Sequence, residues 1–267
     1  MSGGARSIDT TAATAYEEHL VAKVFGPWAE RVVDLAAPAP GEAVLDVACG
    51  TGAGARLAVS RVMPGGRVVG LDNDPGMVEV ARRLAARRKI DVEWHCESAL
   101  TLPFADATFD LCLCLQGPQF LSDPLAGLTN IRRVLRTTGR LAASFWASIE
   151  HNKGHHALAQ ALEKQDLAPA LRPFSLGDPG TARALFTEAG FRTVALRTEE
   201  READFPSVAA FIEGIAAGAP ATRHALAQLS DHRKQDFVAD VGKILEPYAG
   251  PDGLRLPTRS HIVIAEP

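Results

Sequence analysis

The sequence of 267 residues predicts an α/β fold with an open, parallel sheet, and three observations support this prediction. From Ala43 onward, short apolar runs alternate with helical stretches, which is typical of strands joined by crossover helices. The first apolar run leads directly into a glycine-rich turn, residues 50–54. Two aspartates, Asp46 and Asp72, stand at the ends of the first two runs, at the edge where such sheets bind ligands.

The first 40 residues are expected to form a helical cap. Apolar residues recur at helical spacing from Tyr16 to Phe25, and Pro27 begins a second run that reaches Leu35. The core that follows, residues 41–146, is expected to hold five strands. These are Ala43–Ala48, Arg67–Asp72, Val92–Cys96, Phe109–Leu115 and Arg140–Trp146.

Several helix ends between these strands are marked by their sequence. Asp74 is suited to cap a helix whose first position is Pro75. Pro124 opens a helix that runs to Arg136, and Gly139 ends it ahead of the fifth strand. These signals predict the crossover helices that neighbouring parallel strands require.

The alternation of strand and helix changes after Trp146. We expect two insertions in the remaining chain, and we expect substrate choice to depend on them. The four segments are a polar insertion over residues 147–177, a helix and a sixth strand (Val194–Arg201) within 178–205, a helical insertion over 206–250, and a short last strand (His261–Ala265) within 251–267.

The composition argues against several classes of function. A net charge of −4 and a pI near 6.1 give no basic surface for nucleic acid or an anionic membrane. No stretch has signal-peptide character or spans a bilayer, so a cytoplasmic protein is expected. The four cysteines lack the spacing of a zinc site, so no metal is expected. Cys112 and Cys114 share one strand face, as core residues would.

The segment Val44–Gly54 carries the most chemical information. Its three glycines let the backbone approach a ligand closely, and the helix that begins there directs free N–H groups at the same crevice. Asp72 ends the second strand, where a carboxylate can accept hydrogen bonds from both hydroxyls of a ribose. Asp46 would repel a pyrophosphate, whereas it would attract the ammonium group of a methionine moiety.

Two other interpretations of this segment are open. Gly50-x-Gly52-x-x-Ala55 also fits the dinucleotide-binding pattern, which makes an NAD(P)-dependent reductase one alternative. Short-chain reductases use a Tyr-x-x-x-Lys pair, however, and neither Tyr16 nor Tyr248 has a lysine four residues later. A glycine-rich turn without any ligand is the other alternative.

Four motifs occur in order between Tyr16 and Trp146: VLDVACGTG, VVGLDNDPGMVEVAR, LPFADATFD and CLQGPQFLSDPLAGLTNIRRVLRTTGRLAASFW. With these motifs the chain resembles the class I S-adenosylmethionine-dependent methyltransferases of the ubiquinone/menaquinone-biosynthesis-like type (methyltransferase type 11). The resemblance implies a Rossmann-like, seven-stranded, mostly parallel sheet whose last strand lies antiparallel between the fifth and the sixth. It also implies helices on both faces and helical lid insertions.

The resemblance further implies which residues bind S-adenosyl-L-methionine. Asp46, Gly50 and Gly52 would surround the methionine part, with Ala48 where the family often has glycine, and Tyr16 would fold over that end. The residues implied for the ribose, for the adenine and for the closing of the site are Asp72, Asn73, Met77, Ser98, Ala99, Leu115 and Gln116. The family often has aspartate where Ser98 stands, and a neutral serine there could lower the affinity about fivefold.

The activity implied is methyl transfer to an O, N or C atom of a small-molecule acceptor, either quinone-like or a secondary metabolite. Displacement from a sulfonium depends on positioning and desolvation, so no fixed catalytic motif is required. His151 and His155 are candidate bases for an acceptor that loses a proton, with a solvated loop or helix start as the other interpretation. Gln119, Phe120 and Trp146 are candidates for the substrate side. A cofactor-binding protein without methyl transfer, such as a cyclase or a regulatory subunit, is the alternative function.

Overall fold

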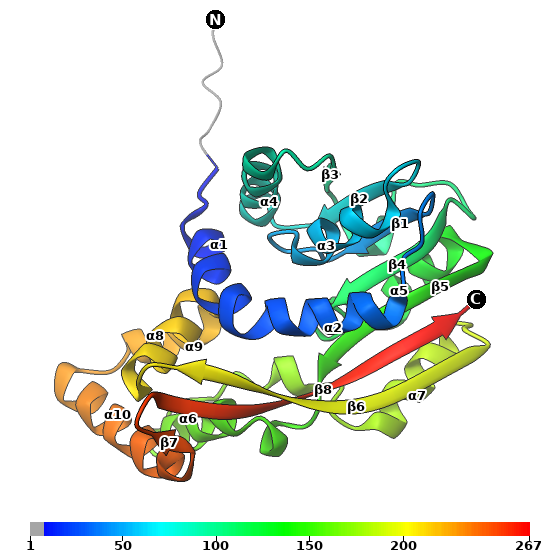
Figure 1. The fold of residues 1–267 in the computed structure, drawn as a ribbon. Helices are drawn as coiled ribbons and strands as arrows, with labels where there is room; N and C mark the ends of the chain where they lie inside the picture. The colour runs from blue at the N-terminus through cyan, green and yellow to red at the C-terminus, as the bar shows by residue number, and fades with distance from the viewer. Residues whose placement is uncertain (1–7) are drawn as a thin grey trace, which may run out of the picture.

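Figure 1 shows the computed structural model, which describes residues 8–267. The strands in this part of the chain are β1 (Ala43–Val47), β2 (Arg67–Asp72), β3 (Glu93–Cys96), β4 (Phe109–Leu115), β5 (Leu135–Trp146), β6 (Thr193–Phe205), β7 (Ala249–Gly250) and β8 (Gly253–Glu266). They form one sheet in the order β3-β2-β1-β4-β5-β8-β6, with the short β7 paired to β8. β8 is antiparallel to β5 and β6, whereas β1 to β5 are parallel. The predicted topology is therefore confirmed, and the two-residue β7 was not predicted.

Helices cover both faces of the sheet. α2 (Gly26–Ala36) and α3 (Ala53–Val62) contribute to the core on one face, and α5 (Pro124–Val134) and α7 (Pro179–Glu188) contribute to the core on the other. Successive residues of β4 serve the two cores in turn, because neighbouring side chains of a strand point to opposite faces. Cys112 and Cys114 accordingly lie together in the second core, fully buried, as the sequence predicted.

The N-terminal segment forms one continuous helix. α1 (Thr11–Ala15) leads into a π-helical stretch, η1 (Tyr16–Phe25), which leads into α2. The two helical runs predicted here are thus joined, with Pro27 in the first turn of α2, where its missing N–H group costs nothing. In Figure 1 this blue helix lies between the parallel part of the sheet and the helices of the second half of the chain.

α4 (Pro75–Arg88) begins as its sequence predicted. The Asp74 carboxylate accepts hydrogen bonds from the N–H groups of Gly76 at 2.7 Å and Met77 at 3.2 Å, and Pro75 occupies the first position. This cap fixes the start of the helix beside the end of β2, and the side chains that follow β2 are held with it.

The predicted starts of the fifth and the last strand were wrong. β5 begins at Leu135, which is buried and pairs with Phe109 of β4. The register then shifts, so that Leu111 of β4 pairs with Arg140 and the residues between Leu135 and Arg140 form an irregularity in β5. β8 extends from Gly253 and pairs with all of β6, forming a long ribbon. Pro257 lies in the part of β8 that pairs with β6, and β5 pairs β8 only from Ser260 on, so the proline has a free strand edge on that side.

Four further helices pack at the end of this ribbon, at the lower left of Figure 1, and we call them the lid helices. They are α6 (Lys153–Glu163), α8 (Val208–Gly218), α9 (Pro220–Ala227) and α10 (Asp231–Leu245). The predicted polar insertion, residues 147–177, contains α6, which buries Leu158 and Leu162 against this group. None of the helices in residues 8–267 combines the length and the apolar character that crossing a bilayer demands.

Short 3-10 turns complete the connections between these elements. They are η2 (Ala99–Thr101), η3 (Pro118–Phe120), η4 (Ile149–His151), η5 (Arg172–Phe174) and η6 (Glu246–Tyr248). Two of them, η2 and η3, follow β3 and β4, so they lie at the carboxyl edge of the sheet where β1 and β2 also end.

Candidate functional site

The carboxyl end of β1 holds a buried carboxylate with one free oxygen. Asp46 is 1% exposed, and its Oδ2 accepts a hydrogen bond of 2.7 Å from the N–H group of Ala55 in α3. Its Oδ1 is buried and has no hydrogen-bond partner among residues 8–267. A Cβ atom at Gly54 would lie 2.8 Å from Oδ2, so a glycine is needed for this approach. A buried polar atom of this kind indicates a missing partner.

The environment of Asp46 disfavours its charge. Burial raises the pKa of its carboxyl to about 7, against the hydrogen bond from Ala55 and with a further contribution from the charge of Asp72. Because desolvation is the main cause, a cation placed beside Oδ1 would restore the ionised form. This corner of the fold is therefore suited to a positively charged group.

Asp72, at the end of β2, holds the same turn from its other side. Its Oδ2 accepts from the N–H group of Gly50 at 2.8 Å, and its Oδ1 accepts from that of Asp74 at 2.9 Å. Burial raises the pKa of Asp72, although these two N–H groups oppose the rise. Each carboxylate oxygen retains a second lone pair, so Asp72 can still accept from two hydroxyls of a ligand.

These two carboxylates border two adjoining cavities. The first, which we call the inner pocket, encloses about 440 Å³, and the second, the outer cleft, about 1310 Å³, open solvent at the mouths included. The inner pocket is lined by Tyr16, Val21, Phe25, Trp28, Ala29, Asp46, Ala48, Cys49, Gly50, Thr51, Ala53, Gly54, Leu115, Gln116 and Ser144. The outer cleft is lined by Tyr16, Ala48, Gly50, Leu71, Asp72, Asn73, Asp74, Met77, Glu97, Ser98, Ala99, Leu100, Leu115, Gln116, Gly117, Phe120, Leu121, Ser122, Arg172 and Gly218. The shared residues Tyr16, Ala48, Gly50, Leu115 and Gln116 mark the junction.

Eleven of the twelve residues that the sequence suggested for cofactor binding line one or both cavities. Gly52 lines neither. It has a φ of +83°, and a Cβ atom there would lie 2.4 Å from the Trp94 ring. A glycine is therefore needed at position 52 so that the turn can pack against Trp94 of β3. The motif alone does not distinguish this role from contact with a ligand.

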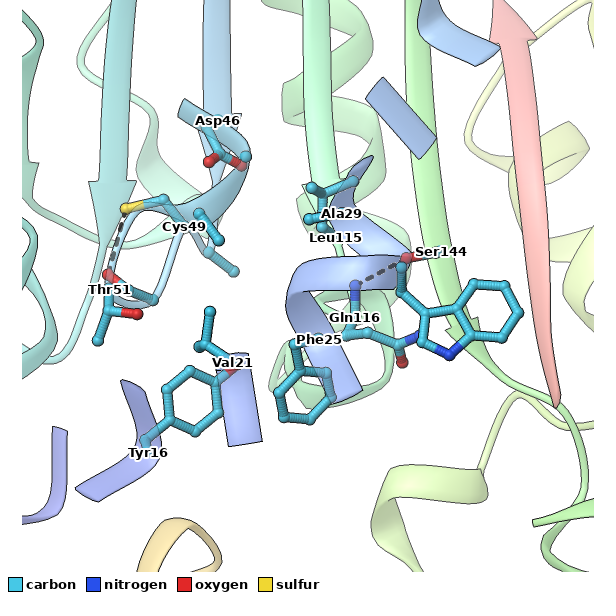
Figure 2. Close-up of a pocket in the computed structure, with 15 residues that line it drawn as sticks. Tyr16, Val21, Phe25, Ala29, Asp46, Cys49, Thr51, Leu115, Gln116 and Ser144 are labelled. Atoms are coloured by element: carbon cyan, nitrogen blue, oxygen red, sulfur yellow. Dashed lines mark hydrogen bonds between the residues drawn. The ribbon is translucent and has the colours of Figure 1, made fainter. Parts of the chain in front are cut away.

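Tyr16 reaches over the inner pocket from η1. Figure 2 shows its ring across the pocket from Asp46, next to Phe25, on which it stacks with ring centroids 5.2 Å apart. A Cβ atom at Gly50 would lie 3.7 Å from the Tyr16 ring, so the tyrosine is close to the turn. Burial raises the pKa of the Tyr16 hydroxyl, which stays protonated and can act as a hydrogen-bond donor.

The next residue, Glu17, attaches this helix to the turn, and the sequence analysis did not find it. Its carboxylate accepts hydrogen bonds from the Thr51 hydroxyl and, at 2.8 Å, from Arg56 Nη2 of α3. Arg56 also donates to the carbonyl oxygen of Thr51. The Arg56 side chain is 6% exposed and that of Glu17 is 17% exposed. The detectable signal was an arginine on the apolar face of the first crossover helix.

A polar network forms the far wall of the inner pocket. The Gln116 N–H group donates to Ser144 Oγ at 3.1 Å, as drawn in Figure 2, and its side-chain amide donates to Ser260 Oγ at 2.8 Å. Gln119, a predicted substrate-side residue, is buried and donates to Gln116 Oε1 at 3.1 Å. It therefore supports Gln116 from behind, and it lines neither cavity.

The other predicted substrate-side residues lie at different depths. Phe120 is exposed and lines the outer cleft. Trp146 is buried behind the inner pocket, 5.9 Å from the Phe25 ring and 6.4 Å from the Trp28 ring. Phe25 and Trp28 line the pocket themselves, and no motif identified them. The apolar side of the inner pocket is thus aromatic.

The candidate histidines lie outside both cavities. His151 is exposed and contacts Arg259, with His151 Nδ1 and Arg259 Nη1 3.2 Å apart, in a separate surface depression. His155 points inward from α6, with its ring between Trp146 at 6.1 Å and Phe174 at 5.4 Å. Burial lowers the pKa of His155 to about 4. The structure therefore does not bring either predicted base to the inner pocket or the outer cleft.

Comparison with known proteins adds to this geometry. A family model described as a methyltransferase domain matches residues 44–139, which run from β1 to the start of β5. The chain is 35% identical over 158 residues to a demethylmenaquinone methyltransferase of Thermus thermophilus, a match that covers 59% of this chain and 70% of that protein. It is also 35% identical over 126 residues to an aklanonic acid methyltransferase of Streptomyces sp. strain C5, covering 47% of this chain and 57% of that protein.

Solved structures share the same fold. A phosphoethanolamine N-methyltransferase of Haemonchus contortus, in complex with S-adenosyl-L-methionine, superposes with a TM-score of 0.62 at 19% identity. The superposition covers 97% of this chain and 57% of that protein, so the lid helices are included in the shared architecture.

Proposed function

Because this chain belongs to the class I S-adenosylmethionine-dependent methyltransferases of the ubiquinone/menaquinone-biosynthesis-like type, we propose that it methylates an O, N or C atom of a small-molecule acceptor. The observation that carries the proposal is the free, buried Oδ1 of Asp46. A methyltransferase of this type binds a methionine moiety, whose ammonium group supplies the missing partner of that oxygen.

The chemistry of the two cavities fits the rest of the cofactor. Asp46 and Tyr16 would hold the methionine part in the inner pocket. Asp72 would accept from the ribose hydroxyls, and the remaining predicted residues of the outer cleft would surround the adenosine: Asn73, Met77, Ser98 and Ala99. A pyrophosphate in place of the methionine would meet the Asp46 carboxylate, which argues against a dinucleotide.

The protein's contribution to the reaction is positioning and the exclusion of water. The bound cofactor supplies an activated methyl group on a sulfonium, which is an excellent leaving group. The acceptor atom gives the electron pair for the new bond to the methyl carbon, the electrons of the broken carbon–sulfur bond go to sulfur, and a hydroxyl or carbon acceptor also loses a proton. Leu115 and Gln116, at the junction of the cavities, would align the acceptor.

The acceptor side favours a flat, mainly apolar molecule. Phe25 and Trp28 offer ring faces, while Gln116 and Ser144 offer hydrogen-bonding groups beside them. The two relatives are named for demethylmenaquinone and for aklanonic acid, and a quinone ring is flat, which suits such a wall. We therefore favour a quinone-like or aromatic acceptor. We expect the two insertions, residues 147–177 and 206–250, to determine which acceptor binds.

Calorimetric titration with S-adenosylhomocysteine, in parallel with NADH, tests the cofactor. We expect micromolar binding of S-adenosylhomocysteine alone, weakened at least tenfold in Asp72→Ala. The matched control is Asp34→Ala, an aspartate on the surface of α2. Absence of S-adenosylhomocysteine binding by folded protein would refute the proposal, and NADH binding would revive the reductase.

A methyl-transfer assay tests the activity. Labelled S-adenosyl-L-methionine is incubated with a panel of quinols, phenols, amines and activated methylene compounds, and incorporation of label is measured. Transfer to at least one acceptor, lost in Asp46→Asn, is the expected result. Tight cofactor binding without transfer to any of these acceptors would instead support the non-methylating alternative.

A further inference from the structure

A separate cavity lies among the lid helices, and we call it the lid pocket. It encloses about 420 Å³, including space open to solvent. Its wall is formed by α6, by η5 and the segment before it, by the end of α8 and by the start of α9. The lining residues are His155, Leu158, Ala159, Leu162, Pro169, Ala170, Pro173, Ile215, Ala219 and Thr222. Eight of these ten side chains are apolar.

The two polar side chains of the lid pocket have no hydrogen-bond partners among residues 8–267. Thr222 is 6% exposed, yet the structure gives its hydroxyl no bond, and the same is true of the His155 ring. The polar atoms of both side chains are accessible from the cavity and are not sealed in the interior, so a bound molecule can reach them. Because both groups face the same space, one ligand can bond to both.

The lid pocket lies next to the outer cleft. Arg172 and Gly218 line the outer cleft, while the residues that directly follow them in the chain, Pro173 and Ala219, line the lid pocket. The two cavities therefore meet at the same two backbone segments. On its other side the His155 ring is 6.1 Å from that of Trp146, which packs against Phe25 of the inner pocket.

We propose that the lid pocket is the subsite for the end of the acceptor that is remote from the methylated atom, and that this end is an uncharged, apolar group bearing one hydroxyl or carbonyl oxygen. This inference rests on the proposed function, because it assigns part of the acceptor to a cavity beside the reaction site. It makes His155 and Thr222 specificity residues.

The lining of the lid pocket discriminates against an acidic group. It contains no lysine or arginine, and the low pKa of His155 keeps its imidazole neutral at pH 7. Arg172 and Arg223 directly adjoin lining residues in the sequence, and their guanidinium groups donate to the carbonyl oxygens of Phe120 at 3.0 Å and of Ala217 at 3.3 Å. A carboxylate in the lid pocket would lose its water without gaining a counter-charge. A hydroxyl, in contrast, can donate to the imidazole and accept from Thr222.

Three probes that share a propylbenzene skeleton test the assignment: 4-propylphenol, 4-propylbenzoate and propylbenzene. Each is titrated against the full chain at pH 7, with and without S-adenosylhomocysteine, by calorimetry and by NMR of the His155 ring and the Thr222 methyl group. We expect the phenol to bind about two- to tenfold more tightly than propylbenzene, since one or two buried hydrogen bonds are gained, and more tightly than the benzoate. The phenol should shift both NMR signals.

Variants of the lid pocket locate the binding. Thr222→Val, which keeps the shape of the side chain, should weaken the phenol about two- to tenfold and leave propylbenzene unchanged. Ala159→Leu, which fills the cavity, should weaken both. The control is Gln160→Ala, on the exposed side of α6. Unchanged affinity for S-adenosylhomocysteine in each variant shows that the fold and the cofactor site are intact.

The outcomes separate the two proposals. Equal binding of the phenol and the benzoate, no binding of the phenol at millimolar concentration, or no effect of both Thr222→Val and Ala159→Leu would overturn the lid-pocket assignment. Failure of S-adenosylhomocysteine to bind the wild type would overturn the proposed function, whereas the titrations without it would still report on the lid pocket.

Discussion

The affinity for S-adenosylhomocysteine should rise with pH up to about pH 7, because of Asp46. Burial raises the pKa of this carboxyl to about 7 in the free protein. An ammonium group beside Oδ1 favours the ionised carboxylate, so the pKa falls on binding. Binding therefore releases a proton, and the affinity increases as the pH approaches the pKa of the free protein.

The size of the effect follows from that pKa. With a free-state pKa of about 7, about 3% of Asp46 is ionised at pH 5.5 and about 90% at pH 8. The affinity should therefore increase about thirtyfold between these pH values, which corresponds to about 2 kcal/mol. Burial also raises the pKa of Asp72, which adds to the same slope, so a variant is needed to isolate the contribution of Asp46.

Calorimetry in buffers of different ionisation enthalpy measures both the affinity and the proton release. We expect about 0.9 proton released at pH 6 by the wild type. In Asp46→Asn the affinity should be low at every pH and most of the slope should be lost, whereas the surface variant Asp34→Asn should match the wild type. A flat wild-type profile between pH 5.5 and 8, or an undiminished slope in Asp46→Asn, would refute the reasoning.

Three further predictions concern stability. The raised pKa of Asp46 means that the folded state binds more protons than the unfolded state between about pH 4 and pH 7. The free energy of unfolding of the ligand-free protein should therefore fall by up to about 4 kcal/mol as the pH rises from about 4 to about 7. Urea unfolding at a series of pH values should detect a smaller fall in Asp46→Asn. Gly52→Ala should lower the free energy of unfolding by about 2 kcal/mol or more beyond Gly41→Ala, because both have positive φ but only the first meets a ring; unfolding curves that coincide would contradict this. Glu17→Ala should cost about 3 kcal/mol by leaving a buried arginine unpaired and should speed the release of S-adenosylhomocysteine in stopped flow, whereas the exposed Glu18→Ala should do neither.

The parallel part of the sheet was predictable because its signals agree. β1, β2 and β4 are short apolar runs, and their neighbours carry helix caps such as Asp74. The long β6/β8 ribbon was underestimated for a physical reason. Its outer half alternates buried and exposed positions, but the buried positions of β8 include the polar residues Thr258 and Ser260, and Pro257 interrupts the pattern, so the apolar residues alone did not indicate its length.

Site residues could be predicted where a sequence motif lies at the end of a predicted strand. They could not be predicted where elements distant in the sequence meet. Asp46 and Asp72 lie at the carboxyl ends of two strands that the sequence pattern predicts, so both were found. Gly52 shares its motif with ligand-contacting glycines, yet its positive φ and its packing on Trp94 explain its presence. Phe25 and Trp28 reach the pocket only because a continuous helix crosses the sheet, and a single sequence contains no record of that crossing.

The pairing of Phe205 with Leu254 has a consequence for how such a chain can change. These two residues are partners in an antiparallel ladder, so their Cα atoms lie about 5 Å apart, as the ends of a hairpin do. Everything between them, including three lid helices, leaves and re-enters the sheet at one point. The helical segment is therefore a cassette: another sequence can replace it without altering the register between β6 and β8, and acceptor preference can be exchanged by grafting, provided that the graft restores the packing of α8 on η1 and the position of Gly218 in the outer cleft.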